Sequence, residues 1–287
     1  MQFRYAMIPP APHLAAWINT FYTIETEAER IEEIMPAYSA QISLVVRGRV
    51  TLAYADGSIG ESSTVTVNAP QLRSAPCVLD GPLTLIGVSL THVGWQALSN
   101  LPADQVHDTI IPAASLFAPD VLAQLESVAA ECRSGRLTPA DLCAPLGEAI
   151  GTAPFVPRAD HVAVVNAMTD WLGSGFDPAL ADLHAAVNVS PRQLQRIARR
   201  YFGAPPAQVL KRLRALRAAM LLANPGLSDA LREEMLTSYF DQAHLIRDIR
   251  RYTGRTPTQL RTQMLSTVTL DPAGHGDTSA LLLPEGS

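Results

Sequence analysis

The chain has little of what metal enzymes and disulfide-stabilised domains depend on. Its three cysteines, Cys77, Cys132 and Cys143, are odd in number and lack CxxC spacing, which argues against a disulfide framework and a zinc site. The seven histidines are scattered without an HxH pair. Gly87-Val88-Ser89-Leu90 lacks the second glycine of a nucleophile elbow, and no glycine-rich phosphate loop occurs. We therefore expect no catalytic residues, no metal and no cofactor.

Long apolar runs are also missing. No stretch approaches about 18 uninterrupted apolar residues, and the start MQFRYAMIPP lacks the pattern of a signal peptide. We expect a soluble, cytoplasmic protein that does not engage a membrane.

Charge is distributed unevenly along the 287 residues, which are enough for two domains. Residues 180–262 hold 14 Lys and Arg against 6 Asp and Glu, a net charge of +8, whereas the remainder has a net charge of −13. A basic C-terminal part is thus joined to an acidic N-terminal part. This asymmetry is typical of a protein in which only one domain approaches phosphate.

The basic part begins with a helix, a tight turn and a second helix. Leu180, Leu183 and Val187 repeat at helical spacing before a break. Ser190 then offers a side-chain acceptor to the free amides of a new helix, and Pro191 takes the first helical position. This spacing predicts a helix-turn-helix.

The second of these helices is predicted to be amphipathic. Leu194, Ile197 and Tyr201 share one face. The opposite face carries Arg192, Gln193, Gln195, Arg196 and Arg199. Arg and Gln match guanine and adenine edges in the major groove, although a solvated basic face is the simpler interpretation of one such helix.

A second, similar pattern follows the predicted linker helix 205–223. Leu245, Ile249 and Tyr252 face inward, and the outward positions are Gln242, His244, Arg247, Arg250 and Arg251. The two patterns lie about fifty residues apart. One long helix between them could place two recognition helices in successive major grooves.

The region from Asp177 to Arg261 resembles the AraC/XylS family of transcription regulators. The resemblance rests on Ser190-Pro191-Arg192-Gln193-Leu194-Gln195-Arg196, Gly203 with Pro206, the 214–222 linker helix, Asp241-Gln242-Ala243-His244, and Gly254-Arg255-Thr256-Pro257. It implies base contacts from Arg192, Gln195, Arg196, Gln242, His244 and Arg247. We assign phosphate contacts to Ser190, Arg199, Arg200, Lys211, Arg250, Arg251 and Arg255.

The second module departs from the family pattern. Ser238 stands where the family usually has glycine, and Glu233 and Glu234 stand where small or apolar residues are usual. A non-glycine residue in a left-handed turn costs about 1 kcal/mol, and a buried carboxylate costs more. Either the preceding helix is shifted by about one residue or this module binds DNA weakly.

Signals of strands and turns dominate residues 1–90. We expect strands at 21–24, 64–67 and 83–90, a hairpin of 42–46 and 50–54 turning at 47–49, and a short helix at 12–18. Helices are expected at 93–98, 119–132, 139–150 and 160–173. The expected fold class is α+β, with a small β-barrel and flanking helices ahead of an all-α domain with two helix-turn-helix motifs.

The family resemblance implies that the barrel is a cupin-like sensor and dimerisation domain. A small barrel can hold a ligand in its mouth. The candidate ligand-binding residues are Trp17, Tyr22, Tyr38, Arg47 and Arg49, with Trp95 as a further aromatic. For each of them an ordinary core or surface role is the simpler interpretation.

The expected organisation is a sensor domain at 1–152, a DNA-binding domain at 158–264 and a disordered tail at 265–287. The predicted function is a DNA-binding transcription regulator. Its expected partners are double-stranded DNA, a small-molecule effector, RNA polymerase and a second copy in a homodimer. Two alternatives remain open: an enzyme built on the barrel, and a protein-interaction module that has lost DNA binding.

Overall fold

The computed structural model describes residues 3–223 and 229–261 of the chain. The expected disordered tail, 265–287, lies outside the described residues.

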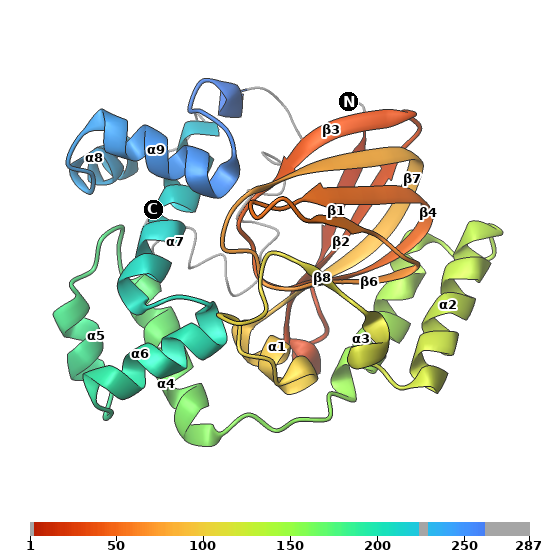
Figure 1. The fold of residues 1–287 in the computed structure, drawn as a ribbon, viewed down its shortest axis with the longest axis horizontal. Helices are drawn as coiled ribbons and strands as arrows, with labels where there is room; N and C mark the ends of the chain where they lie inside the picture. The colour runs from red at the N-terminus through yellow and green to blue at the C-terminus, as the bar shows by residue number, and fades with distance from the viewer. Residues whose placement is uncertain (1–2, 224–228, 262–287) are drawn as a thin grey trace.

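The N-terminal part is built on one antiparallel sheet (Figure 1). Its strands are β1 (Arg4–Ile8), β2 (Ile18–Thr26), β3 (Arg30–Met35), β4 (Gln41–Ala53), β5 (Ile59–Glu61), β6 (Val65–Asn68), β7 (Ala75–Leu90) and β8 (Ile110–Ile111). They pair in the order β1-β2-β7-β4-β6-β8, with β3 on β7 and β5 on β4. Among these described strands β1 and β8 do not pair with each other, so the sheet stays open. The expected fold class, a β-rich N-terminal domain ahead of an all-α domain, is confirmed, but the barrel is not closed.

The hairpin expected around residues 47–49 is a single strand, β4. Gly48 has a φ of +81°, and the register against β7 shifts on both sides of Arg47. These features describe a β-bulge, in which glycine accepts the left-handed backbone without strain. A Cβ at Gly48 would lie 2.6 Å from the Asp80 carbonyl oxygen, so the strand passes too close to β7 for another side chain.

Most helices lie on two opposite flanks of the sheet, and α1 (His92–Ser99) lies below the sheet, between the two flanks (Figure 1). The first group comprises α2 (Pro119–Arg133) and α3 (Cys143–Gly151). The second comprises α4 (Ala159–Gly173), α5 (Leu180–Ala186), α6 (Pro191–Phe202), α7 (Pro206–Ala223), α8 (Asp229–Thr237) and α9 (Gln242–Thr253). The helix expected at 139–150 starts as a 3-10 turn, Pro139–Leu142, and the one expected at 12–18 is only the turn Pro12–Leu14. None of the helices in the described ranges has the length and apolar character to cross a membrane.

The helical part has two separate hydrophobic cores. One joins α4, α5 and α6 to the start of α7, and the other joins the end of α7 to α8 and α9. Leu213 packs against both cores. Each expected helix-turn-helix module therefore folds around its own core, and α7 is common to both.

Candidate nucleic-acid interface

The first recognition helix, α6, begins and ends as its sequence predicts. Ser190 Oγ accepts a hydrogen bond from the Gln193 amide at 3.3 Å, and Gly203 ends the helix with a φ of +80°. Leu194 and Ile197 are buried. Arg192, Gln195, Arg196 and Arg199 are exposed on the opposite face. These cationic and amide side chains are free to approach a nucleic acid.

The second recognition helix, α9, has the same plan. Asp241 Oδ1 accepts a hydrogen bond from the His244 amide at 2.6 Å, and Gly254 ends the helix with a φ of +72°. Each cap lies 51 residues after its counterpart in α6. Gln242, Arg247, Arg250 and Arg251 are exposed.

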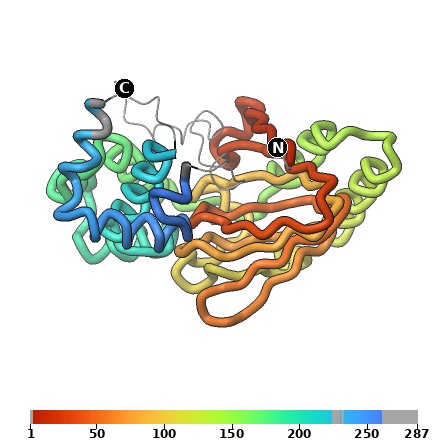
Figure 2. Tube along the Cα trace, turned by 90° about the horizontal axis from the view of Figure 1, so that it is seen from above, coloured from red at the N-terminus to blue at the C-terminus, as the bar shows by residue number. Residues whose placement is uncertain are grey.

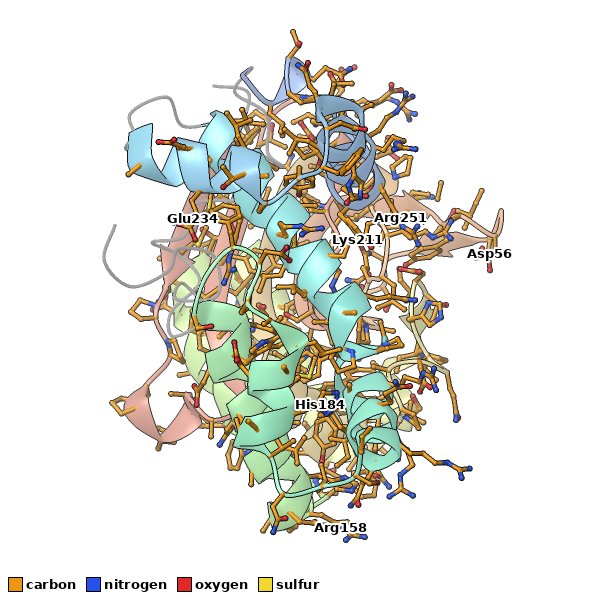
Figure 3. All side chains as sticks on the ribbon, turned by 90° about the vertical axis from the view of Figure 1, so that its left-hand side faces the viewer. Asp56, Arg158, His184, Lys211, Glu234 and Arg251 are labelled. Atoms are coloured by element: carbon orange, nitrogen blue, oxygen red, sulfur yellow. The ribbon has the colours of Figure 1, made fainter. Side chains whose placement is uncertain are left out.

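Two arginines of α7 hold the modules together. Arg217 is fully buried and donates to the carbonyl oxygens of Leu172, in the last turn of α4, and of Gly175, just after the helix. Arg214 Nη1 lies 2.8 Å from Asp177 Oδ1 and donates to the Ser238 carbonyl at 3.0 Å. The turn after α4 and the turn before α9 are thus tied to one helix, which runs diagonally between the two modules in Figure 3.

The departures in the second module cause no visible strain. Among the described non-glycine residues, Asn100 and Asp108 have a positive φ and Ser238 does not. Glu233 and Glu234 are exposed, and Glu234 Oε1 accepts a hydrogen bond from the Phe176 amide at 3.2 Å. The turn before α9 therefore needs no glycine, because Ser238 has an ordinary backbone conformation.

Two predicted contact residues face a buried carboxylate. Lys211 Nζ lies 3.1 Å from Asp248 Oδ1, and His244 Nε2 lies 3.2 Å from Asp248 Oδ2. Asp248 is 3 % exposed. Lys211 neutralises this carboxylate and His244 lies beside it, which makes both side chains less available to DNA than the exposed arginines.

Three other predicted phosphate contacts lie where the recognition helices meet the N-terminal part (Figure 2). Arg255, 6 % exposed, pairs with the equally buried Glu33 of β3 at 2.7 Å. Arg200 Nη2 donates to the Asn100 carbonyl at 3.0 Å, and the Arg251 carbonyl accepts from the Ser74 amide at 3.3 Å. The assignment of Arg255 to phosphate is corrected for this conformation, because its guanidinium is shielded by the sheet.

The N-terminal part touches the same end of both recognition helices. A Cβ on Gly203 would overlap Leu72, and a Cβ on Gly254 would overlap Ile34. The Ala37 amide also donates to the Tyr252 carbonyl at 2.9 Å. The cap at Gly203 therefore rests on the connection between β6 and β7, and the cap at Gly254 rests on β3.

A cavity of about 520 Å³ lies between the sheet and helices α4 and α7. Two of the predicted ligand-binding residues, Tyr22 and Tyr38, line it. Burial raises the pKa of Tyr22 to about 12, and its hydroxyl donates to Gln41 Oε1 at 2.9 Å. The other candidates lie outside this lining: Trp17 packs on the core, and Arg47 and Arg49 are exposed on β4. Trp95, at 1 % exposure, is a core residue.

Arg212 of α7 also lines the cavity, although no pattern in the sequence indicates this. Its Nη2 donates to the Phe202 carbonyl at 3.3 Å, and burial lowers the pKa of its guanidinium. Within the described residues it forms no ion pair with a carboxylate. A half-buried guanidinium that has no ion pair among the described residues suits an anionic group.

Glu33 was also missed, although the alternation of β3 contains a signal for it. Ile31, Glu33 and Met35 share one face of the strand, so a period of two places Glu33 beside apolar neighbours. Its partner Arg255 is 222 residues away and follows from no local pattern.

Comparison with known proteins gives a family match for the helical part. A family model described as "Helix-turn-helix domain" matches residues 183–263. No curated protein matches the chain. ToxT from Vibrio cholerae superposes with a TM-score of 0.46 at 8% identity, covering 92% of this chain and 99% of that one.

Two further solved structures are similar at the same low level of identity. ToxT bound to (E)-4-(8-methylnaphthalen-1-yl)but-3-enoic acid has a TM-score of 0.46 at 8% identity, covering 90% of this chain and 98% of that one. The AraC-like transcriptional activator CuxR has a TM-score of 0.31 at 9% identity, covering 84% and 88%. The family match therefore identifies residues 183–263, which contain both capped recognition helices, as a helix-turn-helix domain.

Proposed function

We propose that this protein regulates transcription by reading a two-part DNA site with α6 and α9. The observation that carries the proposal is the repeat of one capped helix, with exposed cationic residues, at each end of α7. Arg192, Gln195 and Arg196 would read bases in the first half-site, and Gln242 and Arg247 in the second. Exposed Arg199 and Arg250 would hold phosphates.

Selection of bound sequences from a random DNA pool tests this function. Full-length protein should recover two short elements about one helical turn apart, and Arg196→Ala should blur one of them at a cost of about 1–3 kcal/mol. Arg136→Ala is the matched control, because Arg136 is exposed between α2 and the 3-10 turn, away from the helical modules. Equal motifs from all three proteins would contradict the assignment of Arg196.

The surviving alternative is a protein-interaction module without specific DNA binding. It is distinguished by salt, because displaced counterions make the affinity of a DNA-binding protein fall steeply as salt rises. Arg199→Gln and Arg250→Gln should each reduce the slope of log K against log salt by about one. An affinity that does not change between low and high salt would favour the alternative.

We further propose that an amphipathic carboxylate controls DNA binding from the interdomain cavity. Arg212 supplies the anion contact, and Ile18, Leu79, Leu213 and Leu216 supply apolar walls. Since Arg212 and Leu213 belong to α7, a ligand held there would contact the helix shared by both modules. It would shift DNA affinity only if it bound one arrangement of the modules more tightly than another.

Calorimetric titration with dodecanoate tests the cavity. Dodecanoate should bind the native protein, and Arg212→Gln should weaken binding by about tenfold or more. Dodecanol has the same chain without the charge and should bind both proteins alike. Failure of dodecanoate to bind, or equal binding to both proteins, would refute the role of Arg212.

We also propose that the protein works as a homodimer, since paired half-sites suit paired subunits. If the protein activates transcription, we propose that it also contacts RNA polymerase. Sedimentation with and without the selected DNA checks the first proposal, and transcription in vitro checks the second.

A further inference from the structure

The 51-residue repeat makes the two recognition helices comparable position by position. Ser190 corresponds to Asp241, Leu194 to Leu245 and Tyr201 to Tyr252. The same offset pairs the exposed Arg192, Gln195 and Arg196 with the exposed Ala243, the half-buried Ile246 and the exposed Arg247. Of these three positions only one keeps its arginine, whereas the cation Arg192 and the amide Gln195 of α6 are replaced by two apolar side chains in α9.

The apolar character continues at the N-terminal end of α9. Phe240, directly before the capping Asp241, is 95 % exposed, although a large aromatic side chain gains free energy by leaving water. Its counterpart in the first module, Val189, is half-buried and packs on the core. Phe240 packs on no such core, so it extends the solvent-facing surface of the second module.

Apolar side chains on a recognition helix have one distinctive partner among base edges. Thymine presents a C5-methyl group in the major groove, and Ala and Phe side chains contact it. Arg and Gln instead pair with the hydrogen-bonding edges of guanine and adenine. The two helices therefore differ in the chemistry that they can recognise.

We infer that the second module selects thymine by its methyl group, through Phe240, Ala243 and Ile246. This inference rests on the proposed DNA-binding function and adds a base preference to it. The first module reads hydrogen-bonding edges, so the two elements of the site differ in sequence. Arg247 and Gln242 orient α9 over the thymines and do not determine this preference alone.

Replacement of thymine by uracil in the selected site removes only the methyl groups. The second element is the one that Arg196→Ala leaves sharp. For each contacted thymine there, uracil should weaken binding roughly fourfold, the effect expected for one buried carbon. The same replacement in the first element should change affinity less than about twofold.

Phe240→Ala and Ile246→Ala should bind the thymine and uracil duplexes alike. Ile59→Ala is the matched control, because Ile59 is equally apolar and 68 % exposed, but lies on β5. Thermal melting verifies that each variant is folded. Loss of discrimination in both α9 variants, but not in Ile59→Ala, establishes the inference.

Four outcomes would overturn the inference. Uracil without effect in the second element, or discrimination unchanged in the variants, refutes methyl recognition while DNA binding stands. A Phe240→Ala protein that keeps its DNA affinity but loses transcription in vitro shows that Phe240 meets a protein instead. If no motif is enriched at all, the proposed DNA-binding function fails and the inference fails with it.

Discussion

Glu33 and Arg255 form an ion pair that is buried between the sheet and the second module. Glu33→Gln would leave the Arg255 guanidinium without this carboxylate, and we expect it to lower the free energy of unfolding by about 3–5 kcal/mol. Glu32→Gln is the control. The Glu32 side chain, next to Glu33 in sequence, is 77% exposed, and a surface ion pair contributes at most about 1 kcal/mol to stability. Urea denaturation measures both variants. Equal stabilities would contradict the argument from burial.

His92 is a second residue whose environment has a measurable consequence. It packs on Phe202, and burial, followed by the nearby Arg212 charge, lowers its pKa to about 3. In the unfolded chain the His92 imidazole binds a proton near pH 6.5, whereas in the folded chain it stays neutral down to about pH 3. The free energy of unfolding therefore falls as the pH drops from about 6.5 toward 3. Between pH 7 and pH 5 the loss should be about 2 kcal/mol. His92→Gln should show a smaller loss when denaturation is repeated at the two pH values.

At the scale of elements, the N-caps of α6 and α9 differ in strength. Ser190→Ala should cost about 1 kcal/mol of stability, and Ser190→Gly only a few tenths, because glycine suits the cap position. Asp241→Ala should cost more, up to about 2 kcal/mol, since its carboxylate makes the 2.6 Å bond and also meets the positive end of the helix dipole. Chemical denaturation without DNA measures all three. A larger effect at Ser190 than at Asp241 would reverse this ranking.

At the scale of the whole molecule, both recognition helices are held at one separation. α7 has 18 residues, and each recognition helix also rests by its C-terminal cap on the N-terminal part. Five base pairs inserted between the two elements turn one of them to the opposite side of the duplex. We therefore expect a loss of at least about tenfold in affinity by gel shift, because one helix then misses its groove. The same insertion outside the two elements is the control, and tolerance of both insertions would show that α7 and the sheet do not set the spacing.

Local patterns in the sequence by themselves determined the positions of the helices in the first module and of α9 in the second. Caps such as Ser190, Pro191 and Gly254 act on neighbouring residues, and the 3.6-residue periodicity of α6 and α9 records which face meets a core. Tertiary contacts alone decided the rest. Gly48 lies in a bulge and not in a turn because β7 packs against it. Arg255 is buried because it forms an ion pair with Glu33, which is 222 residues away in the sequence. The cavity at Arg212 and the open sheet likewise depend on strands and helices far apart in the chain, and no window of sequence contains both sides of such a contact.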